Sequence, residues 1–416
     1  MYLDHVLERS PALCQAALEM HQKGLIPANT WVIDLDAIAQ NAAALAKAAR
    51  AEGLTTYLMS KQHNRNPYIN AIALAQGLHK IVAVDATCCL HAARYGLPLG
   101  HAGHLNQIPK HQMAQVVAMR PEVITIYNAE HARWIDRAAA ELGITQDLLI
   151  RVYAPGDVFF DGQEGGFSEA EIPALVAALK AMPNVRLIGV TAFPCLRYNE
   201  TATEQVEITP NMHTIIRAAE QLRALGIEVL QINAPGNTSS ADMALLKRYG
   251  ATHVEPGNAL LGTVPNNAFR NDLAERTAFV YISEISHFYA GRAYAYGGGV
   301  YHTAYGDKIE GLVGANWQDA RNNRVEYRHD VHQDIDYHMQ FEPAPGQRCQ
   351  IGDSVLCAYR TQMHMTRSYV VPISGLAAGL PWLHYIFDNA NNALDKDFNP
   401  VSPALVCKDI AALIRD

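Results

Sequence analysis

Lys61 stands at the end of a short apolar run, and its amine is the group in this chain best placed for covalent chemistry. The run Thr55–Ser60 leads into it, and a polar turn then precedes Pro67, where a helix is expected to begin. This order of apolar run, lysine, turn and helix predicts a strand that feeds a βα loop. An amine held at such a strand end can attack a carbonyl group. Taken alone, Lys61 is better interpreted as a solvated lysine on a loop, and the further motifs below are what favour a role in chemistry.

A later strand end opens into a loop of small residues that form hydrogen bonds. Asn237, Thr238 and Ser239 follow Gly236, which would let the backbone approach a ligand closely. Exposed N–H groups at the start of a helix bind phosphate well. The loop therefore predicts a phosphate site, although plain helix capping by Ser239 or Ser240 explains the same residues about as well.

The next strand end repeats this arrangement and adds a carboxylate. Glu255 is followed by Pro256, Gly257 and Asn258, so its side chain would point from the strand end into the same mouth. Gly257 and Asn258 would complete a phosphate cradle, a device that recurs on the last strands of barrels. The alternative is a surface glutamate before a Pro-Gly turn.

Tyr296 precedes three consecutive glycines, Gly297 to Gly299, in the C-terminal half of the chain. Glycines let the chain come close to a partner, and a tyrosine beside them can donate and accept a proton. The same residues would also suit a sharp bend next to a half-buried sheet.

Four histidines stand where they could line a site. His63 follows Lys61 closely and could touch a substrate or cofactor. His101 and His104 flank a glycine at another strand end, where a satisfied core histidine is at least as good an interpretation. His364 lies in the C-terminal third, between two methionines.

Strand-like runs alternate with helical patterns through the first two thirds of the chain. Strands are expected at 55–60, 80–84, 101–108, 122–126, 148–153, 186–192, 228–233 and 252–254. Eight strands that alternate with helices are the count of a TIM-like (β/α)8 barrel, an α/β fold that carries its chemistry at the strand C-termini. A doubly wound open sheet would give a similar alternation.

Beyond about residue 275 the pattern changes to strand-like runs separated by Gly- and Asp-containing turns, which predicts a mostly β second domain. The expected divisions are an N-terminal helical extension (1–29), a cofactor-binding barrel (30–270), a mostly β domain (271–378) and a C-terminal tail with a terminal helix (379–416). A chain of 416 residues is long enough for two domains with cores of their own.

The composition narrows the classes of function. A net charge of -8 and a pI near 6.1, without any basic run, argue against nucleic acid as the main partner. No stretch approaches the roughly 18 uninterrupted apolar residues of a membrane span, and the N-terminus lacks a signal-peptide pattern. The seven cysteines lack metal-type spacing and fit a reducing cytoplasm, with Cys88 and Cys89 buried on a helix rather than bridged.

Taken in their order, these motifs resemble a known family. Val32–Ile38, Lys61, Glu255–Gly257 and Tyr296–Gly298 follow one another as in the alanine-racemase-like enzymes, which are fold-type III enzymes that use pyridoxal 5'-phosphate (PLP). The resemblance covers roughly residues 30–375 and looks closest to the YhfX-type subgroup.

The resemblance implies two acid/base groups. Lys61 would be the Schiff-base lysine for PLP and the first of them. Tyr296 would be the second, presented to the opposite face of the cofactor by another subunit of a homodimer. Two bases on opposite faces of a planar carbanion are what racemisation of an amino acid needs, because one removes the α-proton and the other returns it.

The resemblance also implies a set of cofactor-binding residues. The phosphate would be held by Asn237, Thr238, Ser239, Gly257 and Asn258, and Tyr369 resembles a phosphate-contacting tyrosine of the family. Glu255 would face the pyridine nitrogen, where a carboxylate keeps the ring protonated and makes it a stronger electron sink.

Two positions depart from the family patterns. Alanine racemases place an arginine before Pro-Gly, whereas Glu255 resembles the basic-amino-acid decarboxylases, whose C-terminal Cys-Asp pair is absent here. His364 stands where the D-threonine aldolase and D-serine dehydratase branch has a His-x-Cys zinc pair. Thr366 replaces that cysteine, so no metal is expected.

These features predict a cytoplasmic, homodimeric, PLP-dependent amino-acid racemase or epimerase, with an amino acid or amine as substrate. His63, His104 and His364 are candidate substrate contacts. A decarboxylase or D-amino-acid lyase of the same fold is the alternative, and a PLP-binding protein with little turnover is a third.

Overall fold

The computed structural model describes residues 2–199, 205–300, 309–328, 337–362 and 368–415. The chain forms two compact units. The β unit contains Met1–Asn41, Gln62–Ile72 and Asn258–Asp416, and the barrel unit contains Ala42–Lys61 and Ala73–Gly257.

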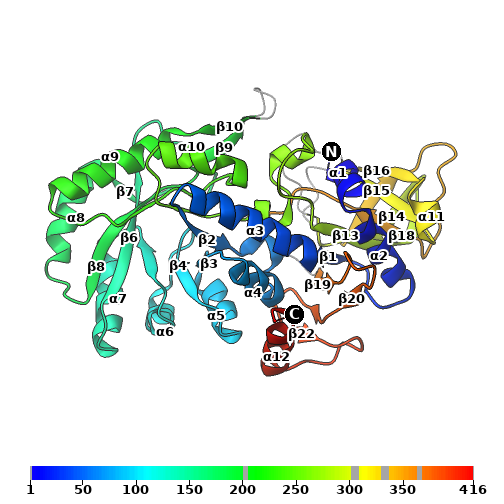
Figure 1. The fold of residues 1–416 in the computed structure, drawn as a ribbon, viewed down its shortest axis with the longest axis horizontal. Coiled ribbons are helices and arrows are strands. Elements are labelled where there is room, and N and C mark those ends of the chain that lie inside the picture. The colour runs from blue at the N-terminus through cyan, green and yellow to red at the C-terminus, as the bar shows by residue number, and fades with distance from the viewer. Residues whose placement is uncertain (1, 200–204, 301–308, 329–336, 363–367, 416) are drawn as a thin grey trace. The chain divides into compact units, whose positions relative to one another are not determined.

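The barrel unit is built around eight parallel strands (Figure 1). These strands are β2 (Thr55–Met59), β3 (Lys80–Ala83), β4 (Leu99–Ala102), β5 (Val123–Ile126), β6 (Gln146–Tyr153), β8 (Val185–Thr191), β11 (Gln231–Asn233) and β12 (His253–Val254). Their order is β5-β4-β3-β2-β12-β11-β8-β6, and β5 also pairs with β6, so the sheet closes on itself. The predicted (β/α)8 barrel with a mostly β second domain is therefore confirmed, and the open sheet is excluded.

The barrel strands are short apolar runs, as expected for parallel strands that are covered on both faces. Every residue of β4 and of β5 is buried. β4 ends at Ala102 because Gly103 adopts a φ of 71°, a left-handed conformation that takes the chain out of the sheet. The expected strand over 101–108 is wrong beyond Ala102 for this reason.

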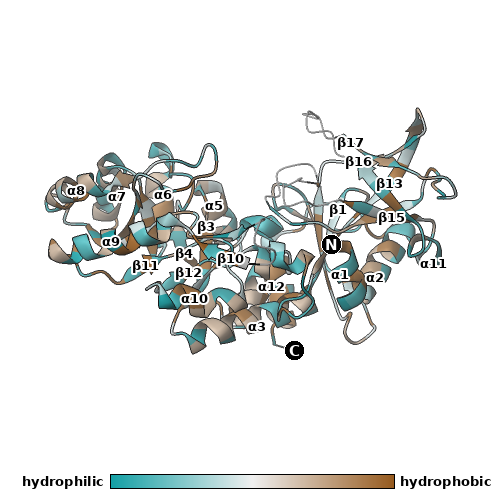
Figure 2. Cartoon of the chain, turned by 90° about the horizontal axis from the view of Figure 1, so that it is seen from above, coloured by the Kyte–Doolittle hydropathy of each residue, from teal (hydrophilic) through white to brown (hydrophobic). Residues whose placement is uncertain are grey.

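Helices alternate with these strands along the chain. They are α3 (Leu35–Ala51), α4 (Pro67–Ala75), α5 (Ala86–Arg94), α6 (Met113–Ala118), α7 (Ala129–Glu141), α8 (Ile172–Leu179), α9 (Pro210–Ala224) and α10 (Met243–Arg248). α5 packs on β3 and β4, and α9 packs on β6 and β8. Brown and teal segments succeed one another along α9 in Figure 2, because one face of such a helix meets the strands and the other meets water.

Shorter elements complete the barrel unit. They are β7 (Phe167–Ser168), β9 (Leu196–Asn199), β10 (Gln205–Ile208) and the 3-10 helices η2 (Lys110–Gln112), η3 (Glu169–Glu171) and η4 (Ser240–Asp242). β7 extends the sheet beside β6, and β9 pairs with β10 in a separate two-stranded sheet.

The β unit contains a second sheet. Its strands are β1 (Thr30–Asp34), β13 (Phe279–Tyr289), β14 (Arg292–Tyr296), β15 (Glu310–Gly314), β16 (Arg324–Arg328), β17 (His338–Glu342), β18 (Ser354–Cys357), β19 (Tyr369–Ser374), β20 (Trp382–Leu383), β21 (Ile386–Phe387) and β22 (Ala393–Leu394). β13 pairs with both β18 and β14, which closes a ring of six antiparallel strands. β1 continues this sheet between β13 and β19.

The N-terminal helices supply much of the core of the β unit. α1 (Tyr2–Arg9) buries Leu3, and α2 (Pro11–Gln22) buries Leu13 and Leu18, in a cluster that includes Val280 and Leu356 of the sheet. Burying each leucine contributes roughly 1.5–3 kcal/mol. The remaining elements are α11 (Trp317–Ala320), α12 (Pro403–Leu413), η1 (Lys61–His63), η5 (Asn258–Leu261) and η6 (Pro265–Ala268).

Two expectations about the whole chain can be compared with the structure. Within the described residues, no helix is both long and apolar enough to cross a membrane. Cys88 and Cys89 are buried on α5, and neither forms a disulfide.

Candidate active site

Lys61 is the second residue after β2, separated from it by Ser60, and begins η1. Its Nζ lies 5.9 Å from the centre of the Phe193 ring, and Phe193 comes two residues after the end of β8. The C-terminal ends of two barrel strands thus bring a lysine amine and an aromatic face together. This is the end of a barrel at which active sites form.

Glu255, the residue after β12, is held by two hydrogen bonds to one of its carboxylate oxygens. His101 Nδ1 lies 2.6 Å from Glu255 Oε1, and Asn233 Nδ2 donates to the same oxygen at 2.7 Å. The other oxygen, Oε2, is buried and has no hydrogen-bond partner among the residues that the structure describes. A buried carboxylate oxygen without a partner is costly, so this atom indicates a place for a donor that the chain itself does not supply.

His104 connects this carboxylate to the lysine. Its ring lies 5.7 Å from the Phe193 ring, and its Nε2 lies 3.3 Å from Glu255 Oε2 without forming a hydrogen bond. Burial lowers the pKa of His104 to about 3, and the charge of Lys61 acts in the same direction, so the imidazole is neutral at pH 7. Lys61, Phe193, His104 and Glu255 therefore form one continuous group.

The charge state of Glu255 follows from its neighbours. Burial raises the pKa of this carboxyl group, but His104 and His101, together with the hydrogen bond from Asn233, outweigh burial and hold the pKa at about 2. Glu255 is therefore an anion in the barrel interior at neutral pH, and its open oxygen attracts a cationic donor.

His101, His104 and Glu255 also lie close enough together to hold a metal ion, with ligand atoms within 4.8 Å of one another. Both nitrogens of His101 are already engaged, one with Glu255 and the other with Thr125. Only His104 and one oxygen of Glu255 remain, whereas zinc sites use three or four protein ligands. The bonding pattern favours an organic cation over a metal.

The loop after β11 carries further atoms without partners. Asn237 Nδ2 and Thr238 Oγ1 are buried and form no hydrogen bond within the described part of the chain. Ser239, by contrast, caps η4, since its backbone N–H and its Oγ both donate to Asp242 Oδ2 at 2.8 and 2.6 Å. The capping interpretation therefore holds for Ser239, while Asn237 and Thr238 keep atoms available for an anion.

The expectation that Gly236 lets the backbone approach a ligand is corrected by the structure. A Cβ atom at Gly236 would lie 2.5 Å from the carbonyl oxygen of Leu196. The two residues form a β-bridge, so the glycine is required by the neighbouring strand.

Arg151 on β6 was not singled out by its sequence pattern, yet it is a buried cation at the same end of the barrel. Its Nη1 donates to Tyr127 Oη at 2.6 Å, and its Nη2 donates to the carbonyl oxygens of Gln163 at 2.6 Å and Phe193 at 3.4 Å. The guanidinium is 1% exposed, and these partners are uncharged. An arginine inside the apolar run Leu148–Val152 was the available signal, because buried arginines need a reason.

Four of the predicted site residues that the structure describes belong to the β unit. His63 is fully buried, contacts Asn70 Oδ1 through Nε2 at 2.8 Å, and has a pKa that burial lowers to about 4. Asn258 begins η5 and has a buried Oδ1 without a partner. The Tyr369 ring lies 5.6 Å from the Phe398 ring. The fourth is Tyr296.

Tyr296 ends β14 and is 44% exposed. It belongs to a cluster of rings on β13, β14 and β17, made up of His287, Tyr294, Tyr296 and His338, which we call the Tyr296 patch. Its backbone is held in place, because Ser283 Oγ donates to the Tyr296 carbonyl at 2.6 Å.

The other predicted positions have simpler outcomes. Gly257 is buried at the end of the barrel unit. His364 and Thr366 lie outside the described residues.

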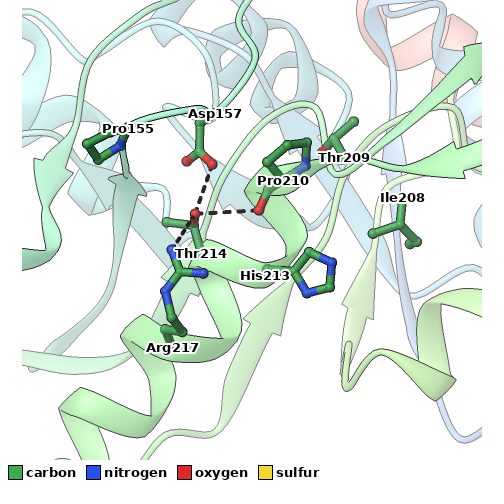
Figure 3. Close-up of a pocket in the computed structure, with 8 residues that line it drawn as sticks. All are labelled: Pro155, Asp157, Ile208, Thr209, Pro210, His213, Thr214 and Arg217. Carbon is green, nitrogen blue, oxygen red and sulfur yellow. Dashed lines mark hydrogen bonds between the residues drawn. The ribbon is translucent and has the colours of Figure 1, made fainter.

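A surface pocket elsewhere on the barrel unit differs from this site (Figure 3). Its polar groups satisfy one another, since Thr214 Oγ1 donates to Asp157 at 2.8 Å and accepts from Arg217 at 3.1 Å. Arg217 also pairs with Glu169 at 2.8 Å. The pocket therefore resembles a solvated helix face.

Comparison with known proteins identifies the class that this fold and site define. Residues 33–265 match the alanine racemase N-terminal domain, and residues 280–383 match the YhfX-like C-terminal domain. The chain belongs to the alanine-racemase-like family of fold-type III PLP-dependent enzymes, in its YhfX-type subgroup. It is 39% identical over 394 residues to "Uncharacterized protein YhfX" of Escherichia coli K12, which covers 95% of this chain and 100% of that protein.

Solved structures show the same fold at low sequence identity. An alanine racemase from Clostridium difficile 630 in complex with cycloserine has a TM-score of 0.62 at 13% identity, covering 88% of this chain and 99% of that one. D-threonine aldolase from Filomicrobium marinum gives 0.61 at 15%, covering 80% and 86%. Diaminopimelate decarboxylase from M. jannaschii gives 0.61 at 13%, covering 91% and 92%. These likenesses concern the fold alone.

Proposed function

We propose that this protein binds PLP at the C-terminal end of its barrel and racemises or epimerises an amino acid. The observation that carries the proposal is the open Oε2 of Glu255, a buried anionic acceptor in one group with Lys61. A protonated pyridine nitrogen is the donor that such an oxygen needs. Family membership makes PLP the cofactor to expect.

The remaining groups of the barrel unit fit the rest of the cofactor. Lys61 would be its covalent anchor. Asn237 Nδ2 and Thr238 Oγ1 have unused hydrogen-bonding capacity for its phosphate, with Ser239 and Gly257 beside them. Arg151 would offer its charge to an anionic oxygen of the cofactor or substrate, because its present partners are neutral.

When bound, PLP supplies an electron sink that makes the α-proton of an amino acid acidic. Glu255 would strengthen that sink, because its open oxygen would keep the pyridine nitrogen of the bound cofactor protonated. Lys61 would then move the α-proton on one face of the substrate, and Tyr296 of a second copy would move it on the other. Neutral His104 would border the substrate without adding charge.

The second copy is part of the proposal because Tyr296 lies on an exposed cluster of rings. Aromatic side chains gathered on a surface are typical of protein interfaces. A homodimer would cover the Tyr296 patch. In that assembly, Asn258 and Tyr369 would contact the phosphate of the cofactor. The substrate contacts proposed for His63 and His364 rest on the sequence motifs alone.

A decarboxylase or a lyase remains the second candidate for a specific reason. Glu255 makes a strong electron sink, and a strong sink also supports loss of carbon dioxide or cleavage of a side-chain bond. The products separate these reactions. Racemisation exchanges the α-proton and keeps every carbon, decarboxylation releases carbon dioxide, and a lyase releases a side-chain fragment.

The cofactor is tested by the visible spectrum of the purified protein with added PLP, before and after borohydride. We expect an absorption band that reduction abolishes and a pyridoxyl group that mass spectrometry locates on Lys61. Lys61→Ala should lose both signals. Lys80→Ala is the matched control, because Lys80 lies at the opposite end of the barrel, paired with Glu122, and should keep both.

The reaction is tested by exchange of the α-proton of amino acids in deuterium oxide. Exchange with retention of all carbons supports racemisation, and exchange that needs Tyr296 supports two bases. Binding of PLP on Lys61 with no exchange for any amino acid would identify a PLP-binding protein with little turnover. A protein that takes up no PLP would contradict the whole proposal.

The shared site is tested by mixing two inactive variants. In a dimer with sites built from both subunits, Lys61→Ala and Tyr296→Phe chains together form one intact site in each mixed dimer. Random mixing should restore about a quarter of the wild-type activity. No recovery, with mixed dimers verified by mass, would show that Lys61 and Tyr296 act within one chain.

A further inference from the structure

His101 lies between Glu255 and Thr125 inside the barrel, and each of its ring nitrogens contacts one of them. Nδ1 lies 2.6 Å from Glu255 Oε1, and Nε2 lies 2.5 Å from Thr125 Oγ1. His101 is 0% exposed and Thr125 is 1% exposed. The three groups are buried, so they satisfy one another rather than bonding to bulk solvent.

The direction of the hydrogen bond between His101 and Glu255 follows from the charge of Glu255. An ionised carboxylate has no hydrogen to donate, so His101 Nδ1 must carry the proton in this contact. At the other ring nitrogen, the contact between Nε2 and the Thr125 hydroxyl holds the ring in place, because a hydroxyl can either donate or accept. Thr125 therefore holds the His101 ring through Nε2, and His101 in turn holds the Glu255 carboxylate through Nδ1.

We propose that His101 is a positioning residue that, together with Thr125, keeps Oε1 of Glu255 occupied and leaves Oε2 aimed at the protonated ring nitrogen of the cofactor. This inference rests on the proposed function, since it concerns how the same site holds PLP. His101 itself contacts Glu255, and the catalytic groups remain Lys61 and Tyr296.

The geometry explains why one oxygen is occupied and the other is open. Asn233 adds a second donor to Oε1 at 2.7 Å, so both hydrogen bonds from the barrel reach the same atom. A carboxylate bonded on one oxygen cannot rotate without breaking both bonds. The strands β4, β5 and β11, which carry these residues, are rigid parts of the closed barrel, and second-shell groups on rigid elements orient the groups that they contact.

The experiment compares the binding of two compounds that differ only at the ring nitrogen. PLP has the nitrogen, and 1-deazapyridoxal 5'-phosphate has a C–H group in its place. Both have the same aldehyde and phosphate, so both can attach to Lys61. The ratio of their dissociation constants measures the bond between Glu255 and the ring N–H and requires no catalytic turnover.

The wild-type protein should bind PLP more tightly than the deaza compound by about tenfold to a hundredfold, the range for a charge-assisted hydrogen bond in a buried site. Glu255→Gln should bring the ratio close to one. His101→Phe should lower it by about tenfold, because Oε1 loses its main donor and the carboxylate can turn.

Conservative variants separate positioning from general damage. His101→Asn keeps an N–H near the place of Nδ1 and should hold the ratio within about twofold of wild type. Thr125→Val preserves shape, removes the hydroxyl and should lower the ratio by about threefold, whereas Thr125→Ser should not. If His101→Phe fails to fold, the two Thr125 variants still decide the question.

Three results would overturn the inference, and they differ in what else they overturn. Unchanged ratios in His101→Phe and Thr125→Val remove the positioning role but leave Glu255 on the ring nitrogen. A wild-type ratio of one, with both compounds attached to Lys61, removes the role of Glu255 as well. Failure of both compounds to attach to Lys61 overturns the proposed function itself.

Discussion

Two carboxylates mark the opposite ends of the barrel, and their bonding differs. Glu122, just before β5, accepts from Tyr57 Oη at 2.9 Å through one oxygen, and its other oxygen contacts Lys80 Nζ at 2.6 Å and His79 at 2.8 Å. Glu255 lies just after β12. Its Oε1 forms hydrogen bonds with two donors, and its Oε2 has no partner among the described residues.

The countercharges differ in the same way. At the N-terminal end of the strands, the chain supplies its own cation, Lys80, and Glu122 is 27% exposed. Burial raises the pKa of Glu122, but hydrogen bonds from Lys80 and His79 outweigh it and lower the pKa. At the C-terminal end, Glu255 is buried with neutral His104 beside its open oxygen.

The difference separates a group that stabilises the barrel from one that we propose to bind the cofactor. A carboxylate with every oxygen bonded within the chain contributes to folding and gives a ligand nothing to contact. A buried carboxylate with a spare oxygen leaves an unmet interaction, which a bound donor can complete. Barrels keep stability at one end of their strands and chemistry at the other, and these two glutamates follow that division.

The largest expected effect is on cofactor affinity. Glu255→Gln should weaken PLP binding by about tenfold to a hundredfold, because a charge-assisted hydrogen bond becomes a neutral one. Glu122→Gln should leave the affinity unchanged. Fluorescence titration of both variants with PLP measures the two constants, and equal losses in both variants would remove the functional distinction between the two ends.

Lowering the pH should destabilise the fold through His253, which lies at the same end of the barrel as Glu122. Burial lowers the pKa of His253 to about 4, below its unfolded value near 6.5, so its contribution is complete above pH 6.5 and is lost as the pH falls toward 4. The loss is up to about 1.4 kcal/mol per pH unit. Urea unfolding from pH 7 to 4.5 should show this slope, and His253→Gln should have a shallower one.

Removing the charge of Glu122 should destabilise the fold without touching the site. Glu122→Gln should lower the free energy of unfolding by about 1–2 kcal/mol, since its bonds to Lys80 and His79 lose their charge. Urea unfolding at pH 7 measures the change. Glu130→Gln is the control, because the pair of Glu130 with Arg133 is exposed and its loss should be undetectable. An equal loss of stability in Glu130→Gln would show that Glu122 contributes no more to the fold than an exposed ion pair does.

The smallest effect is expected in the surface pocket of Figure 3. Arg217→Ala removes an exposed ion pair with Glu169 and should change stability by less than about 0.5 kcal/mol. PLP affinity should stay at the wild-type value. A clear loss of PLP binding in this variant would move the candidate site away from the strand ends.

Much of the fold could be predicted from the sequence, because buried parallel strands are short apolar runs bounded by turns. All eight barrel strands occur where such runs were found, and the strand-like change after residue 275 corresponds to the second sheet. The expected strand over 101–108 failed beyond Ala102, because the backbone of Gly103 is left-handed and ends it. A local pattern does not reveal such a conformation.

The residues of the candidate site could be predicted from the sequence only in part. Lys61 and Glu255 stand out because a charged residue at the end of an apolar run is unusual, and their order along the chain matches a family. Arg151 gave the same kind of signal from within a strand. The assigned roles of Lys61, Tyr296 and Glu255 remain predictions that the experiments above address.

The sequence by itself determined which residues are apolar, where strands and helices alternate and which charged residues follow the apolar runs, since these are properties of neighbours along the chain. Only the tertiary structure decided that β5 pairs with β6 and closes the barrel. It also decided that His101 bonds Glu255 across 154 residues of sequence. Contacts of this kind depend on how distant strands align, and that alignment is set by the packing of the whole barrel.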